Sequence, residues 1–298
     1  MDASGIRRVG VVGAGQMGRG IAQVIAAVGI EVMLCDAKKE LAEAGKGQVA
    51  AVLAKVVAKG KLSAEDRQAL LDRITPAGGI GELAQADLVI EAVSEDFDLK
   101  VKILKEADRV IAEPALLASN TSSLSLTRLA ATTSRPDRVI GMHFMNPVPL
   151  MKLVEIVRGV QTSGETYEAV RDLAVKLGKT VITSADHPGF IVNRMLIPFL
   201  NEACFALQDG LGAAEDIDVG ARLGLNHPLG PLELADLIGL DTLLAIAEVL
   251  HREIGDPKYR PATTLRNLVA AGWLGKKTGR GFYVYDAQGQ KVGRAVAR

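Results

Sequence analysis

Cysteine is scarce in this chain: only Cys35 and Cys204 occur among its 298 residues, and neither belongs to a C-x-x-C or Cys/His metal spacing. Two widely separated thiols cannot supply a disulfide framework, and the usual zinc-ligand patterns are absent. Both cysteines lie in apolar runs, where a free thiol behaves as a small buried hydrophobe. The sequence therefore predicts no metal site and indicates a reducing compartment.

An excess of charge of either sign is also lacking, because 35 basic residues balance 35 acidic ones. A neutral chain provides no overall field that would attract nucleic acid or an anionic membrane. No apolar run approaches the ~20 residues that span a bilayer, and the first residues contain no apolar signal-peptide core. We therefore expect a cytoplasmic protein without nucleic-acid or membrane partners, in which local groups hold any anionic ligand.

What the chain does contain begins with a glycine motif made of Gly13, Ala14, Gly15, Gln16, Met17 and Gly18. A buried strand is predicted before it at 9–12 and a packed helix after it at 20–28. A second strand is predicted at 31–35 and ends at Asp36, 18 positions after Gly18 (36 − 18). This is the dinucleotide-binding fingerprint, in which the glycines allow the turn and the approach of the pyrophosphate to the helix N-terminus. Asp36 would bind the adenosine ribose and repel a 2′-phosphate, which predicts NAD rather than NADP.

Strand and helix patterns alternate up to residue 183. Apolar runs predict strands at 88–93, 116–118, 139–142 and 180–183, and helical patterns occur at 38–74 (with a break at Gly60), 98–112, 126–131 and 164–177. Polar residues at 94–96 and 119–123 follow two of these strands, where open α/β sheets bind ligands. Some of these hydroxyls could instead cap a helix. The lysines near Gly60 are either a solvated face or a contact for a phosphorylated ligand.

His143 and Glu155 form a candidate acid–base pair. His143 follows the apolar run 139–142, and the two prolines Pro147 and Pro149 predict that the chain leaves the sheet at His143. The chain returns in an extended run at 151–157, where Glu155 is the only acid among apolar residues. An imidazole at one strand end and a carboxylate on the neighbouring strand could face each other as a base and its orienting partner. The alternative is a core histidine with a carboxylate at a solvated edge.

After residue 186 the pattern changes to helices, expected at 191–208, 214–223, 231–238, 242–254 and 264–271, with one late strand at 282–285. We therefore predict an α/β fold with a Rossmann-type doubly wound sheet at 1–186, followed by an all-helical C-terminal domain at 187–298. The first of these helices is apolar nearly all round, so it is buried within its domain or against another subunit. We expect a homodimer formed mainly by this second domain.

These motifs together resemble one family, the short-chain L-3-hydroxyacyl-CoA dehydrogenases, and within it the bacterial 3-hydroxybutyryl-CoA dehydrogenases most. The resemblance runs nearly end to end and rests on V-G-A-G-Q-M-G-R-G-I-A-Q, I-E-A-V-S-E-D, S-N-T-S-S-L, H-F-M-N-P-V-P-L-M-K-L-V-E, D-H-P-G-F-I-V-N-R, G-L-N-H-P-L-G-P-L-E-L-A-D-L-I-G-L-D and G-K-K-T-G-R-G-F-Y. One departure is Met145, where the family often has phenylalanine; it affects packing more than chemistry.

The resemblance implies an enzyme that interconverts (S)-3-hydroxyacyl-CoA and 3-oxoacyl-CoA with NAD. It implies that His143 is the catalytic base, that Glu155 pairs with it, and that Ser122 and Asn193 position the substrate. Contacts with the cofactor, beside the glycine turn and Asp36, would come from Glu95, Lys100, Ser122, Asn146 and Lys277. A lysine of the cluster Lys55, Lys59 and Lys61 would meet coenzyme A, and we assign Lys59 to this role without a close alignment there.

Other functions remain open on the sequence. A β-hydroxyacid dehydrogenase of the phosphogluconate type also joins a dinucleotide domain to a helical one, but it uses a lysine base in the helical domain. A cofactor-binding protein without activity, such as the lens crystallins related to this family, could lose the His143 and Glu155 pair, and both residues are present. A sugar-acid dehydrogenase of the gulonate type would need no coenzyme A contact, and a 3-hydroxyadipyl-CoA dehydrogenase differs only in the acyl chain.

Overall fold

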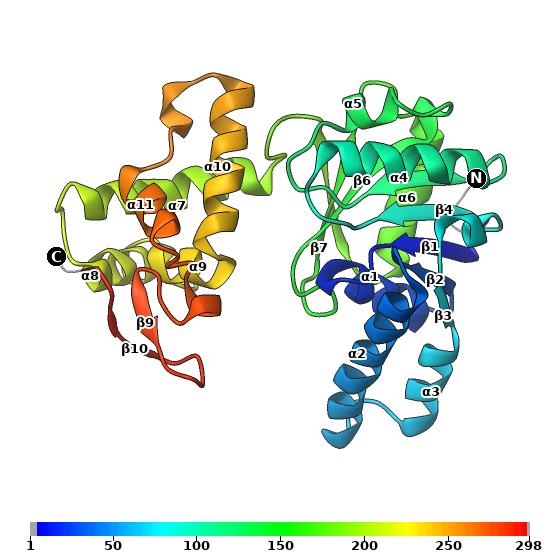
Figure 1. The fold of residues 1–298 in the computed structure, drawn as a ribbon, viewed down its shortest axis with the longest axis horizontal. Coiled ribbons are helices and arrows are strands. Elements are labelled where there is room, and N and C mark those ends of the chain that lie inside the picture. The colour runs from blue at the N-terminus through cyan, green and yellow to red at the C-terminus, as the bar shows by residue number, and fades with distance from the viewer. Residues whose placement is uncertain (1–4, 297–298) are drawn as a thin grey trace. The chain divides into compact units, whose positions relative to one another are not determined.

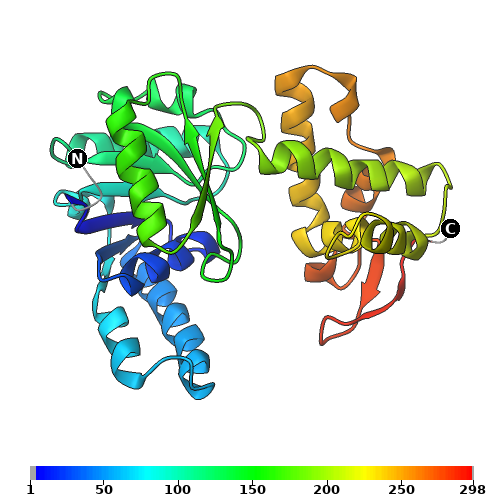
Figure 2. The same cartoon turned by 180° about the vertical axis from the view of Figure 1, so that it is seen from behind.

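The computed structural model of the chain describes residues 5–296. It divides into two compact units, unit 1 at Met1–Phe190 and unit 2 at Ile191–Arg298 (Figures 1 and 2). Among the described residues, no helix is long and apolar enough to cross a membrane. Each unit has a hydrophobic core of its own, and unit 1 has one on each side of its sheet.

Unit 1 is built on an eight-stranded sheet with the order β3-β2-β1-β4-β5-β6-β7-β8. The strands are β1 Arg8–Val12, β2 Glu31–Cys35, β3 Ile74–Ala77, β4 Leu88–Glu91, β5 Leu116–Ser119, β6 Val139–Phe144, β7 Leu153–Arg158 and β8 Thr180–Ala185. The first six run parallel, β7 is antiparallel to β6, and β8 is parallel to β7. The parallel part has the strand order of dinucleotide-binding sheets, whose ligands lie beyond the carboxyl ends of the strands.

Helices cover both faces of this sheet, because alternate strand residues point to opposite sides and each side is apolar. One face packs against α1 Gln16–Ala27, α2 Lys39–Ala58, α3 Ala64–Asp72 and α6 Gly164–Lys176. The other packs against α4 Phe97–Val110, α5 Leu126–Ala130 and a 3₁₀ turn at Ile80–Leu83. In β4, for example, Leu88 and Ile90 belong to the first core and Val89 to the second. The predicted doubly wound fold is confirmed.

Two expectations about unit 1 were wrong. The helical pattern predicted to run to residue 74 ends with α3, and Ile74 begins β3, which pairs with β2. Its Pro76 is tolerated because β3 is an edge strand of the sheet. The chain was also expected to leave the sheet at His143, but β6 continues through Phe144 and turns only at Asn146 and Pro147. The base candidate therefore lies within the strand.

Unit 2 consists mainly of helices: α7 Val192–Gln208, α8 Ala214–Val219, a π-helical turn at Gly220–Gly224, α9 Pro231–Ile238, α10 Leu240–Ile254 and α11 Thr263–Ala270. Every helix expected after residue 186 is present, with ends that differ by a few residues. Unit 2 also contains a hairpin of β9 Tyr283–Tyr285 and β10 Lys291–Arg294, and no sequence pattern predicted β10. The residues of β10 are all exposed and do not alternate between apolar and polar, so the strand had no signal.

Two buried aspartates hold the end of this hairpin against the helices. Asp236 in α9 accepts hydrogen bonds from the backbone N–H groups of Phe282 and Tyr283, both at 2.9 Å, and from the Tyr285 hydroxyl at 3.0 Å. Asp218 in α8 accepts one from the Tyr283 hydroxyl at 2.7 Å. Burial is the main cause that raises the pKa of Asp236 to about 6, and the neighbouring Asp218 adds to it.

Candidate active site

The turn between β1 and α1 requires glycine at two positions. Gly13 has a φ of +105°, and a Cβ there would lie 2.6 Å from the carbonyl oxygen of Ala92. A Cβ on Gly18 would lie 1.7 Å from the carbonyl oxygen of Gly13, so only glycine lets α1 pack this closely on the turn. Within residues 5–296, no side chain caps α1 at Gly15, where an added Cβ would meet nothing within 4 Å. The first N–H groups of α1 can therefore bind an anion.

Asp36 follows β2 and turns its carboxylate toward this glycine turn. Its Oδ2 accepts the Ala14 N–H at 2.7 Å, and its Oδ1 accepts the Ala37 N–H at 2.7 Å. A pocket of about 640 Å³ opens here, lined by the glycine turn, by Asp36 and Ala37 and by residues 92–94 after β4. Its volume is typical of small-ligand sites. The clearance at Gly15, the N-terminus of α1 and the Asp36 carboxylate fit a dinucleotide, with the pyrophosphate at the helix and a ribose at Asp36.

His143 and Glu155 contact each other directly across the antiparallel strands β6 and β7, where they are register partners. The distance from His143 Nδ1 to Glu155 Oε2 is 2.8 Å, and the exposed fractions of the two side chains are 9% and 0%. The Phe190 ring packs edge-on against the imidazole, with 5.8 Å between ring centroids. A carboxylate bound at Nδ1 fixes the neutral tautomer that carries its proton there, which leaves Nε2 as a proton acceptor.

Two asparagines connect the His143 strand to neighbouring loops. Asn120, just after β5, accepts the Phe144 N–H through Oδ1 at 2.9 Å. Asn146, just after β6, accepts a hydrogen bond from Gln16 Nε2 at 2.9 Å, and Gln16 is the first residue of α1. The glycine turn, the β5 loop and the strand of His143 are therefore held together by side-chain hydrogen bonds.

Lys179 braces the loop that joins β6 to β7. Its Nζ donates to the backbone carbonyls of Val148 at 2.6 Å and Met151 at 2.8 Å, and the residue is 9% exposed. Burial lowers the pKa of this ammonium. Because Val148 also packs against Gly20 of α1, the brace links this loop to the helix that begins at the glycine turn.

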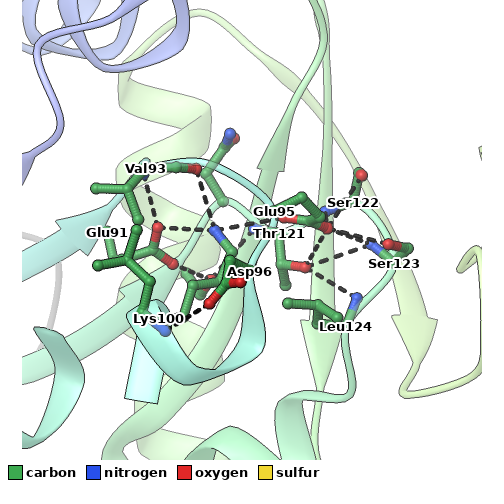
Figure 3. Close-up of polar contacts among 12 residues, drawn as sticks. Glu91, Val93, Glu95, Asp96, Lys100, Thr121, Ser122, Ser123 and Leu124 are labelled. Atoms are coloured by element: carbon green, nitrogen blue, oxygen red, sulfur yellow. Dashed lines mark hydrogen bonds and ion pairs between the residues drawn. The ribbon is translucent and has the colours of Figure 1, made fainter. Parts of the chain in front are cut away.

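Glu95, in the loop after β4, binds the loop after β5 (Figure 3). Its Oε1 accepts the Thr121 hydroxyl at 2.6 Å, the Ser122 N–H at 2.8 Å and the Ser123 N–H at 3.0 Å, and both serine hydroxyls lie 3.1 Å away. Burial alone would raise the pKa of Glu95, but the charge of Lys100 and these hydrogen bonds lower it below its ordinary value. The carboxylate is therefore ionised at neutral pH and fixes the position of Ser122.

Lys100, in the first turn of α4, lies between two carboxylates. Its Nζ is 2.7 Å from Glu91 Oε1 and 3.4 Å from Glu95 Oε2, and it donates to the Val93 carbonyl at 3.4 Å. The side chains of Lys100 and Glu91 are 1% and 0% exposed. With so little exposure the ammonium contacts groups of the protein, and its effect on a ligand would pass through Glu95.

The other predicted site residues lie in separate parts of the chain. Met17 packs partly buried against the first core of unit 1. Lys59 caps the C-terminal end of α2 and is exposed, on a helical hairpin with α3 that extends away from the sheet (Figures 1 and 2). Asn193 lies in the first turn of α7 in unit 2. Lys277, also in unit 2, forms an ion pair with Asp241 at 2.6 Å.

Glu91 and Lys179 are polar groups near this site whose roles the sequence did not predict. Glu91 carried a signal, because it is an acid inside the apolar strand 88–93. Lys179 carried none, since its partners lie about 30 residues earlier in the chain and are backbone carbonyls. Among the described residues, no group of three or more His, Cys, Asp or Glu side chains could hold a metal ion.

Family models match nearly the whole chain. The model described as "3-hydroxyacyl-CoA dehydrogenase, NAD binding domain" matches residues 8–187. The model described as "3-hydroxyacyl-CoA dehydrogenase, C-terminal domain" matches residues 189–285.

Individual proteins are similar over the same length. A probable 3-hydroxybutyryl-CoA dehydrogenase of Bacillus subtilis is 51% identical over 94% of this chain and 98% of its own. The 3-hydroxybutyryl-CoA dehydrogenase of Bradyrhizobium diazoefficiens is 50% identical over 95% of this chain and 97% of its own. The crystal structure of (S)-3-hydroxybutyryl-CoA dehydrogenase from Ralstonia eutropha superposes with a TM-score of 0.92, at 54% identity, over 94% of this chain and 99% of that one.

Proposed function

Because the chain belongs to the 3-hydroxyacyl-CoA dehydrogenase family and is an NAD-dependent oxidoreductase, we propose that its substrate pair is short: (S)-3-hydroxybutyryl-CoA and acetoacetyl-CoA. The observation that carries the proposed chemistry is the buried contact of 2.8 Å between His143 Nδ1 and Glu155 Oε2. The chain length is supported by relatives of about half-identical sequence that are named for the four-carbon substrate.

His143 acts in this proposal as the general base for alcohol oxidation and as the general acid for the reverse reaction. When bound, the nicotinamide takes a hydride from the carbinol carbon or returns it. Nε2 removes the hydroxyl proton as the hydride leaves, and the ring becomes an imidazolium. Glu155 stabilises that cation and holds the ring in the tautomer that the next turnover needs. Ser122 and Asn193 position the substrate, as polar groups that can hydrogen-bond its oxygens.

The cofactor is held by the glycine turn Gly13–Gly18, by Asp36 and by polar residues around them. Asp36 selects NAD over NADP, because a 2′-phosphate would stand against its carboxylate. Further contacts with the cofactor are assigned to Glu95, Ser122, Asn146 and Lys277, and Lys100 acts through Glu95. Lys59, exposed at the end of α2, meets the coenzyme A phosphates. The two buried thiols fit a reducing, cytoplasmic setting.

The test follows the absorbance of NADH while acetoacetyl-CoA is reduced, with NADPH and longer 3-oxoacyl-CoA chains in parallel. We expect a much higher kcat/KM with NADH than with NADPH, and a kcat/KM that falls as the acyl chain lengthens. 3-Oxoadipyl-CoA serves as the competing substrate, because its acyl chain is two carbons longer than that of acetoacetyl-CoA and ends in a free carboxylate. Equal kcat/KM values for NADPH and NADH would contradict the predicted cofactor preference. Faster turnover of 3-oxoadipyl-CoA or of longer chains than of acetoacetyl-CoA would contradict the short-chain assignment.

A further inference from the structure

We propose that Glu91 is a positioning residue for the cofactor site: through Lys100 and Glu95 it fixes the loop Thr121–Ser123. This inference rests on one part of the proposed function, the contact between Ser122 and the cofactor. The side chains form a continuous path from β5 to Glu91 of β4, to Lys100 of α4, to Glu95 in the loop after β4 and then to the loop after β5. Figure 3 shows this path from Glu91 onward.

Both carboxylate oxygens of Glu91 accept hydrogen bonds from groups inside the protein. Its Oε2 accepts the Ser119 hydroxyl at 2.6 Å, and its Oε1 accepts Lys100 Nζ at 2.7 Å and the Val93 N–H at 2.7 Å. Its side chain is 0% exposed, at the carboxyl end of the central strand β4. A buried carboxylate is costly unless it is paired and hydrogen-bonded, and a well-packed apolar pair would serve stability as well. Stability alone therefore does not account for an ion pair at the ligand-binding edge of the sheet.

The two oxygens of Glu95 explain how Glu91 can act at a distance. Oε1 holds the loop Thr121–Ser123, and Oε2 lies 3.4 Å from Lys100 Nζ, which is itself closer to Glu91. The ammonium is thus held mainly by Glu91 and attracts Glu95 less strongly. Without the charge of Glu91, the full attraction of Lys100 falls on Glu95. That carboxylate would be drawn toward α4 and away from the N–H groups of Ser122 and Ser123.

A second buried ion pair in unit 1 provides the comparison. Arg135 Nε is 2.7 Å from Asp108 Oδ1, and both side chains are 8% exposed. Arg135 also donates to the carbonyls of Asp108, Ile111 and Ala112, at the C-terminal end of α4. Its role is accounted for by the helix end that it caps. Lys100 lies at the opposite end of the same helix, at the edge of the cofactor site.

The test compares Glu91→Gln with Asp108→Asn in the full-length protein. Both variants break a buried ion pair, so both should lower Tm. Only Glu91→Gln should weaken NADH binding, measured by NADH fluorescence, with a Kd raised about tenfold, the factor for one lost hydrogen bond to a charged group. Its KM for NADH should rise in parallel while kcat changes less. Asp108→Asn should keep its NADH Kd within about twofold of wild type.

The route through Glu95 is tested by repeating Glu91→Gln in a Glu95→Gln background. There the further change in NADH Kd should be less than about threefold, because residues that act as one unit are not additive. NADH binding requires no acyl-CoA, so this outcome is independent of the substrate proposed above. A Glu91→Gln protein with lower Tm and a wild-type NADH Kd would show a purely structural role and overturn the inference. Full additivity with Glu95→Gln would overturn the route.

Discussion

At the scale of single residues, two carboxylates of unit 1 lie on strands whose other buried side chains are apolar. Glu155 on β7 is bound to His143, and Glu91 on β4 is bound to Lys100. Each is satisfied by a partner that lies on a different element, as the cost of burying a charge requires. The partner decides the role: an imidazole can take and return a proton near neutral pH, whereas an ammonium in the same position can only hold its neighbours in place.

Replacing His143 by glutamine should lower kcat by ~10²–10⁴-fold, the usual contribution of general acid–base catalysis. NADH should still bind, because the glycine turn and Asp36 are unchanged. Glu155→Gln should also slow turnover, since an amide can hydrogen-bond the ring but cannot stabilise the imidazolium. Steady-state kinetics of both single variants and the double variant measure this, and the double should cost clearly less than the product of the singles. A folded His143→Gln protein with near-normal kcat would refute the proposed base.

At the scale of elements, the sequence predicted most helices and strands because their apolar periodicity is strong. It missed β3 and β10 for physical reasons. The edge strand β3 has four residues, including Pro76, directly after a helix, and β10 is exposed throughout. The sequence also drew attention to Glu155 but not to Glu91, because only the first had a histidine motif nearby. Contacts such as Lys179 with Val148 depend on tertiary packing and have no local pattern.

Protonation of Asp236, the buried aspartate that joins α9 to β9, should make unit 2 more stable in mild acid than at neutral pH. The pKa of Asp236 is raised from 3.8 to about 6, mainly by burial, so the folded state binds a proton more tightly than the unfolded chain. Its stabilising contribution is complete below pH ~4 and is lost as the pH rises through ~6, a difference on the order of 3 kcal/mol. Charged neighbours that also face this cluster are Asp218, Glu215, Glu233 and Lys291.

We therefore expect the Tm of unit 2 to rise as the pH is lowered from ~7.5 to ~5. The single tryptophan, Trp273, packs against the core of unit 2 and reports its unfolding by fluorescence. Tyr285→Phe serves as the matched variant. It removes a hydrogen bond that lowers the pKa of Asp236, so its rise in Tm should begin at higher pH. A Tm that falls steadily over this range would contradict the assignment.

At the scale of the whole molecule, unit 2 leaves several large apolar side chains exposed. They are Met195, Leu211, Val219, Leu223, Leu225, Leu237 and Val292, with exposed fractions from 39% to 82%. Many apolar side chains of α7, including Ile197, Leu200 and Leu207, are packed in the core of unit 2, which is one of the two outcomes expected for this helix. The exposed large apolar side chains of unit 2 therefore lie mostly in the segments around α8 and α9, and α7 contributes Met195.

We predict that two copies of the chain associate through exposed apolar side chains of unit 2, because packing them against a second copy would remove them from water. Light scattering at micromolar concentration should give about twice the chain mass of 31.5 kDa. Leu223→Asp combined with Leu225→Asp places charges at side chains that are 82% and 68% exposed, and should give a folded monomer. Val160→Asp is the matched control: Val160 is 87% exposed but lies in unit 1, so this variant should remain dimeric. A monomeric wild type would contradict the predicted association. A double variant that stays dimeric would exclude Leu223 and Leu225 from the contact, because two buried carboxylates without partners cannot be accommodated in an apolar interface.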